Sequence, residues 1–564
     1  MPKNYNTWSK EDLIKEIKKV EKRKKYGIVW ENKPEQVAEL CKEKLPILIE
    51  EKSKEIITDK KKPINILIEG DNYHSLSVLN YTHKGKIDII YIDPPYNTGA
   101  KDWKYNNNYV DDLDMWRHSK WLSFMEKRLK LAKNLLKREG VLICTIDENE
   151  HSALGLLLQE LFLDKEIVCV TIIHNPGGIQ GKNFSYCHEY AYFVYPKGGT
   201  YISKVRRTDI DPTPLRDWGK ESSKRESAKN CFYPIFVKDE KVIGFGEVCD
   251  ENFHPKISNK MRKDGILEIY PIDTSGVERK WRFSRQSVEE IQDELICRKI
   301  KKEYVIIREK KDYRWKTVWT DSKYNANVYG TKLVNNIIKA KFPFPKSLYA
   351  VEDCINAVIH NKNNSIILDF FAGSGTTGHA VLELNKEDGG NRKFILCTNN
   401  EDNDGDGTKI ATDMCYPRLK NVIKGGIGLL NKKKYYGLGG NLKYFKTDFV
   451  DAEPTDKNKC KMVDKCTEML CLKEDCFEEV KKGREFKIFK NYEDKYLGII
   501  YDDEGIESIK EEIKKIKRKF IVYIFSLDDN AKEEEFEDVK ELVDLKPIPE
   551  VIMNVYARIF KWLI

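Results

Sequence analysis

Long apolar runs are missing from this 564-residue chain. Its apolar stretches, such as residues 87–92 and 366–371, fall far short of the ~18–20 residues that span a bilayer. The first residues, Met-Pro-Lys-Asn-Tyr, contain no apolar core of the kind that a secretion signal needs. We therefore expect a cytoplasmic protein that does not contact a membrane.

Cysteine pairs of the zinc-binding kind are also missing. Among 14 cysteines, the one cluster is Cys460, Cys466, Cys471 and Cys476, and it has no Cys-x2-Cys spacing. Met462, Cys466, Met469 and Leu470 fall at helical spacing. We interpret the cluster as one apolar face of a helix, and we predict reduced thiols and no metal site.

The excess of basic charge is small, with 99 Lys and Arg against 91 Asp and Glu, but it is concentrated between residues 200 and 320. Tryptophans and other aromatic residues are interleaved there, a mixture that suits contacts with phosphates and bases. An ordinary charged surface over an aromatic core would look the same. The cations that we predict to contact nucleic acid are Arg206, Arg207, Arg216, Arg279, Lys280, Arg282, Arg285 and Arg314.

Short apolar segments alternate with amphipathic ones on both sides of this basic section. Strands are predicted over residues 64–68, 87–92, 141–146, 166–173, 190–195, 366–370 and 394–398. Helices are predicted over 115–138 and 377–384. This alternation is typical of an open α/β sheet, here interrupted by an insert. Helical periodicity also predicts an arm over residues 1–62.

The strand at 87–92 runs directly into Asp93-Pro94-Pro95-Tyr96. In open α/β sheets, ligands bind at the carboxyl ends of strands. A carboxylate and an adjacent carbonyl can together hold both hydrogens of an exocyclic amine, and Tyr96 could stack on the ring that carries it, as an extruded base requires. A proline-terminated strand with a structural Asp is the alternative for this motif taken alone.

A second strand, 366–370, leads into a glycine-rich turn and a helix start at Asp369-Phe-Phe371-Ala-Gly373-Ser-Gly375-Thr-Thr377-Gly378. Such a turn lets backbone pass close beneath a ligand. No Lys follows the last Gly, so the motif does not support ATP or GTP hydrolysis. Glu401, after the strand at 394–398, lies near where an acid would bind ribose hydroxyls.

Together, the two turns resemble the DPPY and FxGxG hallmarks of the amino-methyltransferases of DNA. The order of the turns, with the basic insert between them, is that of the circularly permuted beta group. Further segments, including Tyr91 to Gly99, Trp116 to Trp121, Gly140 to Glu150 and His188-Glu-Tyr190, look like the modification subunit (Mod) of type III restriction-modification systems.

The resemblance implies a Rossmann-like, permuted methyltransferase sheet with an inserted target-recognition domain and an additional C-terminal α+β domain. The implied parts are a helical arm (1–62), a catalytic half (63–200), the insert (201–320), a cofactor half (321–435) and a C-terminal domain that could form a subunit interface (436–564).

It also implies S-adenosylmethionine as the methyl donor and Asp93, Pro94, Pro95 and Tyr96 as the catalytic residues. The implied cofactor contacts are Asp71, Asp93, Lys346, Ser347, Asp369, Phe371, Ala372, Gly373, Ser374, Gly375, Thr376, Thr377 and Glu401. For Asp71, the alternative is a helix N-cap. Phe371 could equally be a core residue.

The expected reaction is methylation of the adenine N6 amine in duplex DNA by a homodimer, with cleavage left to a separate restriction subunit because the chain lacks a Walker motif. The alternatives are a solitary or type II amino-methyltransferase, acting on N6 of adenine or N4 of cytosine, and a subunit that mainly recognises DNA and recruits a restriction partner. RNA or protein amides are further possible substrates of such turns.

Overall fold

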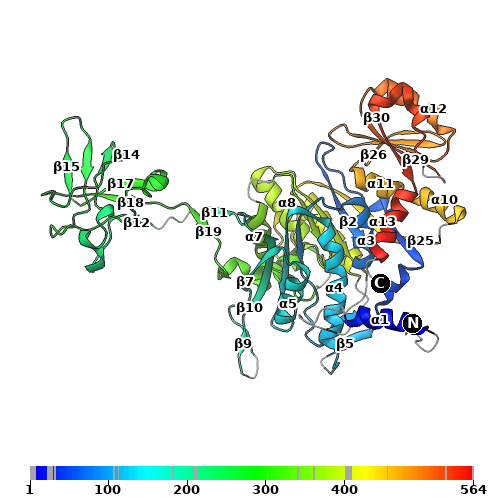
Figure 1. Cartoon of the computed structure of the whole chain (residues 1–564), viewed down its shortest axis with the longest axis horizontal. Helices are drawn as coiled ribbons and strands as arrows, with labels where there is room; N and C mark the ends of the chain where they lie inside the picture. The colour runs from blue at the N-terminus through cyan, green and yellow to red at the C-terminus, as the bar shows by residue number, and fades with distance from the viewer. Residues whose placement is uncertain are drawn as a thin grey trace. The chain divides into compact units, whose positions relative to one another are not determined.

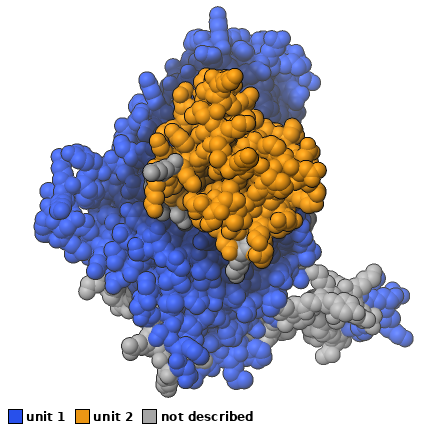
Figure 2. All heavy atoms as spheres, turned by 90° about the vertical axis from the view of Figure 1, so that its left-hand side faces the viewer, with its two compact units in different colours: residues 1–203, 316–564 blue, residues 204–315 orange. Residues whose placement is uncertain are grey.

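The computed structural model describes residues 8–21, 30, 34–105, 108–111, 113–180, 183–206, 212–219, 221–301, 303–339, 342–359, 363–400, 409–453, 455–526 and 530–561. The chain divides into two compact units. The first contains Met1–Ser203 and Lys316–Ile564, and the second contains Lys204–Trp315 (Figure 2). None of the described helices has both the length and the apolar character needed to cross a membrane.

A ten-stranded mixed sheet forms the centre of the first unit (Figure 1). Its strands lie in the order β1 (Lys44–Glu50), β25 (Asn441–Asp451), β2 (Ile64–Glu69), β22 (Lys393–Thr398), β21 (Ile366–Asp369), β3 (Ile87–Ile92), β6 (Leu136–Ile146), β10 (His188–Pro196), β7 (Lys165–Ile173) and β20 (Val318–Trp319). The six strands from β25 to β6 are mutually parallel. Late strands β21 and β22 thus lie between early strands β2 and β3.

Helices cover both faces of this sheet. On β3, Ile90 and Ile92 share a core with Trp121 of α4 (Arg117–Leu135). Ile89 and Tyr91, which alternate with them and so point to the opposite face, are buried as well. Helices α3 (Asn72–Thr82), α4 and α5 (His151–Leu161) pack side by side, as do α7 (Leu348–Ile359), α8 (Thr376–Asp388) and α9 (Tyr416–Lys424).

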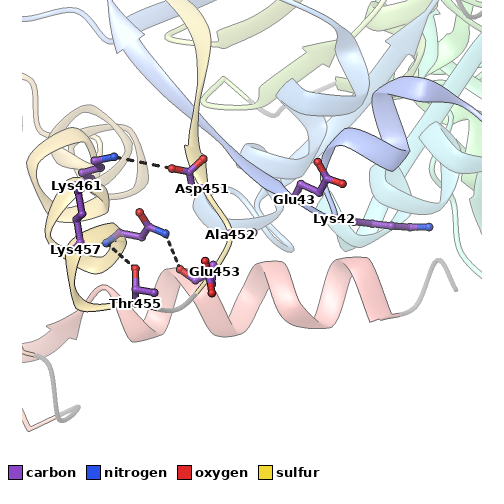
Figure 3. A pocket seen from close by; sticks show the side chains of 9 residues that line it. Lys42, Glu43, Asp451, Ala452, Glu453, Thr455, Lys457 and Lys461 are labelled. Carbon is purple, nitrogen blue, oxygen red and sulfur yellow. Dashed lines mark hydrogen bonds and ion pairs between the residues drawn. The ribbon is translucent and has the colours of Figure 1, made fainter.

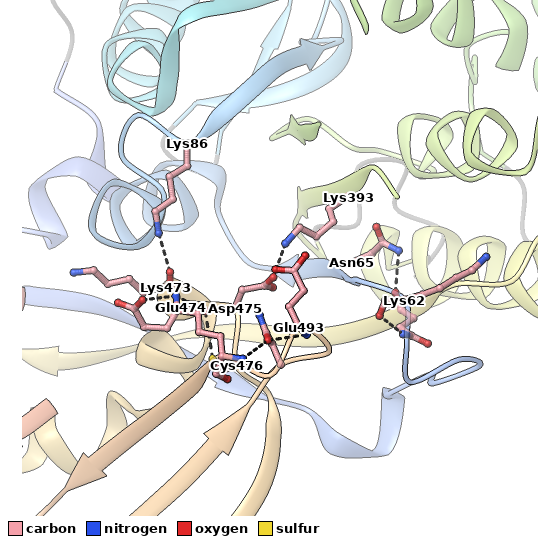
Figure 4. Close-up of polar contacts among 12 residues, drawn as sticks. Lys62, Asn65, Lys86, Lys393, Lys473, Glu474, Asp475, Cys476 and Glu493 are labelled. Carbon is pink, nitrogen blue, oxygen red and sulfur yellow. Dashed lines mark hydrogen bonds and ion pairs between the residues drawn. The ribbon is translucent and has the colours of Figure 1, made fainter. Parts of the chain in front are cut away.

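The C-terminal section has its own five-stranded sheet, in the order β26 (Glu478–Lys482), β27 (Phe486–Lys490), β28 (Tyr496–Ile500), β29 (Phe520–Phe525) and β30 (Val543–Ile548). Helices α10 (Asp456–Lys465), α11 (Thr467–Glu474), α12 (Gly505–Ile516) and α13 (Glu550–Lys561) accompany it. Polar contacts tie it to the main sheet: Lys86 donates to the Lys473 carbonyl at 2.8 Å, and Lys393 pairs with Asp475 at 2.6 Å (Figure 4).

The second unit is mainly antiparallel. Its sheet contains β12 (Thr213–Pro214), β18 (Glu303–Arg308), β17 (Leu295–Ile300), β14 (Lys241–Phe245), β13 (Ile235–Lys238), β16 (Leu267–Ile269) and β15 (Asn259–Met261), and β11 (Lys204–Arg206) pairs with β19 (Asp312–Arg314). Trp281 is buried at its core and donates to the Tyr233 carbonyl at 2.8 Å. The aromatic residues of the basic section therefore include core residues.

All seven predicted strands and both predicted helices are present, with ends shifted by a few residues. The prediction of a helical arm over residues 1–62 is wrong beyond residue 43. After α1 (Lys10–Glu21) and α2 (Gln36–Leu40), β1 is an edge strand of the main sheet, and it pairs with β25. Strand β25 in turn lies beside β2, so the main sheet extends past the predicted boundary at 436. Three cysteines of the predicted apolar face, Cys466, Cys471 and Cys476, are buried in the core.

Candidate active site at the carboxyl edge of the sheet

Three predicted site residues stand at the same edge of the sheet because they lie at the carboxyl ends of parallel strands. Asp71 comes after β2, Asp369 ends β21 and Asp93 follows β3. The charge of Asp93 helps to raise the pKa of Asp369, as expected for carboxyls that face one another across this edge. The edge is where ligands bind in open α/β sheets.

The Asp93 carboxylate is held from one side. The Thr145 hydroxyl donates to its Oδ1 at 2.7 Å, the Tyr96 hydroxyl donates at 2.9 Å, and Lys346 Nζ lies 3.3 Å away. All of these contacts among the described residues fall on Oδ1. Oδ2 is therefore the oxygen that can accept a hydrogen bond from a bound amine.

Lys346 is bound to the Asp93 turn. Its ammonium pairs with Glu189, donates to the Tyr96 hydroxyl and lies 4.4 Å from the centre of the Tyr96 ring. Burial alone would lower the pKa of Lys346, but the carboxylates of Asp93 and Glu189 outweigh it and raise that pKa. Lys346 thus supplies the cation that balances two carboxylates, a placement that the predicted contact with a cofactor did not anticipate.

The turn after β3 is fixed by partners from other elements. Trp121 donates to the Pro95 carbonyl at 2.7 Å. Asn97, buried and with φ at +58°, donates to Glu150 at 2.5 Å, and His118 contacts the same carboxylate at 2.6 Å. Burial raises the pKa of Glu150 above its usual value. These residues lie within segments that resemble the Mod subunit, but their contacts with the turn could not be read from the sequence.

The glycine-rich turn after β21 is shaped by Asp369. Its carboxylate accepts hydrogen bonds from the Phe371 backbone N–H at 2.9 Å and from the Thr377 hydroxyl at 2.5 Å. Burial raises the pKa of Asp369 to about 7. Both of its oxygens accept hydrogen bonds inside the turn, so Asp369 supports the turn, and its contact with the cofactor stays a prediction.

At two positions of this turn, only glycine fits without strain. Gly373 has φ at +49°, and a Cβ there would lie 3.1 Å from the Phe342 ring. Gly375 caps α8 with φ at +81°, and a Cβ there would lie 3.0 Å from the sulfur of Cys415. Only Ser374 lies between them, and the absence of a Cβ on either side of it lets the backbone adopt this tight turn.

A buried arginine missed by the sequence analysis supports the same turn. Arg418 of α9 is 0% exposed, and it donates to the hydroxyls of Ser374 at 2.9 Å and Thr376 at 2.8 Å. It also donates to His379 Nδ1 at 3.3 Å, so this imidazole is a neutral acceptor, consistent with burial lowering its pKa to about 4. No carboxylate among the described residues pairs with Arg418.

The remaining predicted cofactor contacts have structural partners. Asp71 caps α3 by accepting from Tyr73 N at 2.7 Å, as in the alternative interpretation, and it also lies 3.5 Å from Arg128. Ser347 is buried and donates to the Lys323 carbonyl at 2.8 Å. Phe371 packs against Phe124. Glu401 lies outside the described residues.

Three of the eight predicted nucleic-acid contacts hold the second unit together. Arg216 is buried and donates to the Ile272 carbonyl. Arg279 pairs with Asp273 at 2.7 Å, and Arg285 pairs with Glu289 at 2.7 Å. Their guanidiniums are thus engaged within the unit, contrary to a role as free surface cations.

The other five differ in exposure. Arg282 and Arg314 are exposed, whereas Lys280 is half-buried. Lys280 and Arg282 each lie 4.0 Å from Asp217. Arg206 belongs to β11, and Arg207 lies outside the described residues. Arg282 and Arg314 are therefore the best placed of the predicted set to meet a polyanion.

A separate pocket of about 650 Å³ lies beyond the end of β25 (Figure 3). It is lined by residues of both charges, namely Lys42, Glu43, Asp451, Ala452, Glu453, Thr455, Lys457, Asn458 and Lys461. It includes none of the predicted site residues, and three strands, β2, β22 and β21, lie between β25 and β3 in the sheet. The chemistry-bearing residues are thus gathered elsewhere, at the carboxyl edge.

Comparisons with known proteins identify the family of this chain. A family model described as DNA methylase matches residues 87–403. The EcoPI Mod subunit of a type III restriction-modification enzyme from Escherichia phage P1 is 29% identical over 69% of this chain and 65% of its own length. The type II methyltransferase M.KpnI of Klebsiella pneumoniae is 34% identical over 59% of this chain and 79% of its own length.

Among solved structures, the match to the M1.HpyAVI–SAM complex covers 59% of this chain and 92% of the M1.HpyAVI chain, at 14% identity and a TM-score of 0.26. The chain spans less than two thirds of the EcoPI Mod subunit. The matched segment, residues 87–403, begins with the strand that carries the Asp93 turn and includes the glycine-rich turn, and it is more than half of the chain. This chain belongs to the DNA methylase family.

Proposed function

We propose that this chain transfers a methyl group from S-adenosylmethionine to the N6 amine of adenine in duplex DNA. The observation that carries the proposal is the pairing of two turns at one edge. The Asp93 turn after β3 and the glycine-rich turn after β21 follow neighbouring parallel strands, so an amine at the first would face a ligand on the second.

The glycine-rich turn fits such a cofactor. Its close backbone approach at Gly373 and Gly375 and its position at the start of α8 suit the amino-acid portion of the donor. Ala372 to Thr377 would hold that portion, and Asp71 after β2 lies on the side of the turn where a nucleoside could extend. When bound, S-adenosylmethionine supplies a sulfonium-activated methyl group.

The chain itself positions the amine. Asp93 Oδ2 and the Pro94 carbonyl would accept its two hydrogens, which directs its lone pair toward the carbon to be bonded. Pro94 and Pro95 fix φ and hold this geometry. Asp93 Oδ2 can then hold the proton that the methylated amine must lose. No cysteine nucleophile is needed, and burial raises the pKa of Cys144 well above its usual value.

The choice of adenine rests on the Asp that opens the turn and on the likeness to the Mod subunit. Cytosine N4 is the alternative target, since the same acceptors would hold its amine. The similarity to M.KpnI, which extends over 79% of that protein, favours a second candidate function. In it, the chain is a type II methyltransferase that works without a restriction subunit.

In the type III form of the proposal, residues 204–315 recognise the DNA sequence, and the order of the turns reflects circular permutation. The protein would be a cytoplasmic homodimer that uses the C-terminal section as an interface and works with a separate restriction subunit. The likeness to Mod subunits supports this form. Sedimentation that gives a monomer at every concentration would contradict the homodimer.

The test is to incubate the purified full chain with S-adenosylmethionine labelled on the methyl group and with unmethylated genomic DNA of mixed sequence. Label in the DNA, mapped to recurring sites by sequencing, supports the proposal. Label in RNA or protein but none in duplex DNA would overturn it.

A further inference from the structure

Residues 342–347 connect the two turns of the site. At one end, the Phe342 ring lies against Gly373 of the glycine-rich turn. At the other end, Lys346 contacts Asp93, and Ser347 is buried. The Pro345 carbonyl fits so closely to Gly330 that a Cβ there would lie 2.1 Å from it. The segment is therefore fastened to the site on both sides.

Phe344, in the middle of this segment, is 91% exposed. Its φ is +48°, in the left-handed region that a bulky side chain rarely adopts. Prolines at 343 and 345 flank it, and their fixed φ angles restrict the backbone. The chain thus keeps an unfavourable backbone conformation whose result is an aromatic ring in solvent, and strain of this kind is common at functional sites.

An apolar ring held beside a base-extruding site has a direct use. A base that leaves the duplex breaks its stacking contacts and leaves a gap. Proteins that distort DNA insert apolar side chains between bases to stabilise such a state. Phe344 is two residues from Lys346, so its backbone lies within about 7 Å of that of a residue in contact with Asp93.

We propose that Phe344 is a wedge that enters the base stack of duplex DNA beside the target base and keeps that base extruded toward Asp93. This inference rests on the proposed function. It adds a DNA contact in the first unit, outside the basic section to which the sequence analysis assigned recognition. The wedge is needed only where the target base is stacked and paired.

The test compares two duplexes that carry a sequence methylated by the wild-type chain. In one, the target base is paired; in the other, it faces an abasic position. Phe344→Ala and Phe344→Gly should each slow methyl transfer to the paired duplex at least about tenfold and change transfer to the second duplex less than about twofold. Glycine fits the left-handed backbone, so its failure would be due to the missing ring.

Binding provides a second measurement. Both variants should lose more affinity for the paired duplex than for the abasic duplex. Phe344→Trp should restore the wild-type ratio of the two affinities. Tyr436→Ala is the matched control, since Tyr436 is an aromatic residue of β24 (Lys434–Tyr436) that is 82% exposed and outside the site.

Equal losses on both duplexes, or none, would overturn the wedge while leaving the proposed function intact. A wild-type chain that methylates no DNA substrate, single-stranded DNA included, would instead overturn the proposed function and the wedge with it.

Discussion

The ammonium of Lys346 lies 3.3 Å from the Asp93 carboxylate, although the two residues are far apart in the sequence. Asp93 follows β3, and Lys346 precedes α7, after the residues of the second unit. Glu189, at the start of β10, completes the arrangement by pairing with the same ammonium. One buried cation thus balances two carboxylates from different strands, which offsets the cost of burying either of them.

Removing the charge of Glu189 should alter the pH dependence of methyl transfer. The Glu189 carboxylate helps to keep the pKa of Lys346 above its usual value, so Glu189→Gln should lower that pKa. Because a lysine with a lower pKa loses its charge at lower pH, the alkaline limb of the pH–rate profile should move to lower pH. Single-turnover rates between pH 6 and about 10 measure this. An unmoved alkaline limb would contradict the pairing.

Arg418 should govern cofactor affinity. Arg418→Met would free the hydroxyls of Ser374 and Thr376, and we expect affinity for S-adenosylmethionine to fall about tenfold or more, measured by calorimetry. Arg392→Met is the matched control. Arg392 is 3% exposed and pairs with Asp388 at the C-terminal end of α8, whereas Arg418 contacts the N-terminal end of that helix. Equal losses in both variants would reduce Arg418 to a general stabiliser of α8.

Stability without cofactor should fall as pH rises toward neutrality because of Asp369. Its pKa is about 7 when folded, against 3.8 when unfolded, so the folded state binds the extra proton between these values. The loss from this group is of the order of 4 kcal/mol between about pH 4 and pH 7. Asp369→Asn should flatten this part of the curve, measured as urea midpoints at several pH values. A variant with the wild-type slope would contradict the assignment.

The exposed arginines of the second unit should set the salt dependence of DNA binding. Arg282→Ala should weaken binding and reduce the slope of log affinity against log salt by about 1, as for one lost phosphate contact. Arg314→Ala should act alike. Arg279→Ala should instead destabilise the unit, since Arg279 pairs with Asp273. Slopes that do not change in either exposed variant would remove these residues from the DNA interface.

The elements were predictable where one local pattern dominates. The strands that lead to the Asp93 turn and to the glycine-rich turn are short apolar runs, and both are present. Strand β1 was missed because its residues follow a helical section, and only the distant β25 makes them a strand. Pairing across the chain of that kind has no local signal.

The site divides in the same way. Asp93, Tyr96 and the glycine-rich turn lie together at the carboxyl edge, where strand ends placed them. The contacts of Lys346, Glu189 and Arg418 depend on tertiary packing. Charge composition could not separate Arg282, which is exposed, from Arg216, which is buried, because both occur in the same basic, aromatic sequence.

The most direct measurement is the methyl transfer of Asp93→Asn, with the modified nucleoside identified by mass spectrometry after digestion of the DNA. Asp88→Asn is the matched control, because Asp88 lies on the same strand and binds Lys137 and the Ile366 backbone instead of the site. We predict N6-methyladenine from the wild-type and Asp88→Asn proteins and at least about a hundredfold less from Asp93→Asn. Undiminished N6-methyladenine from Asp93→Asn would contradict the account.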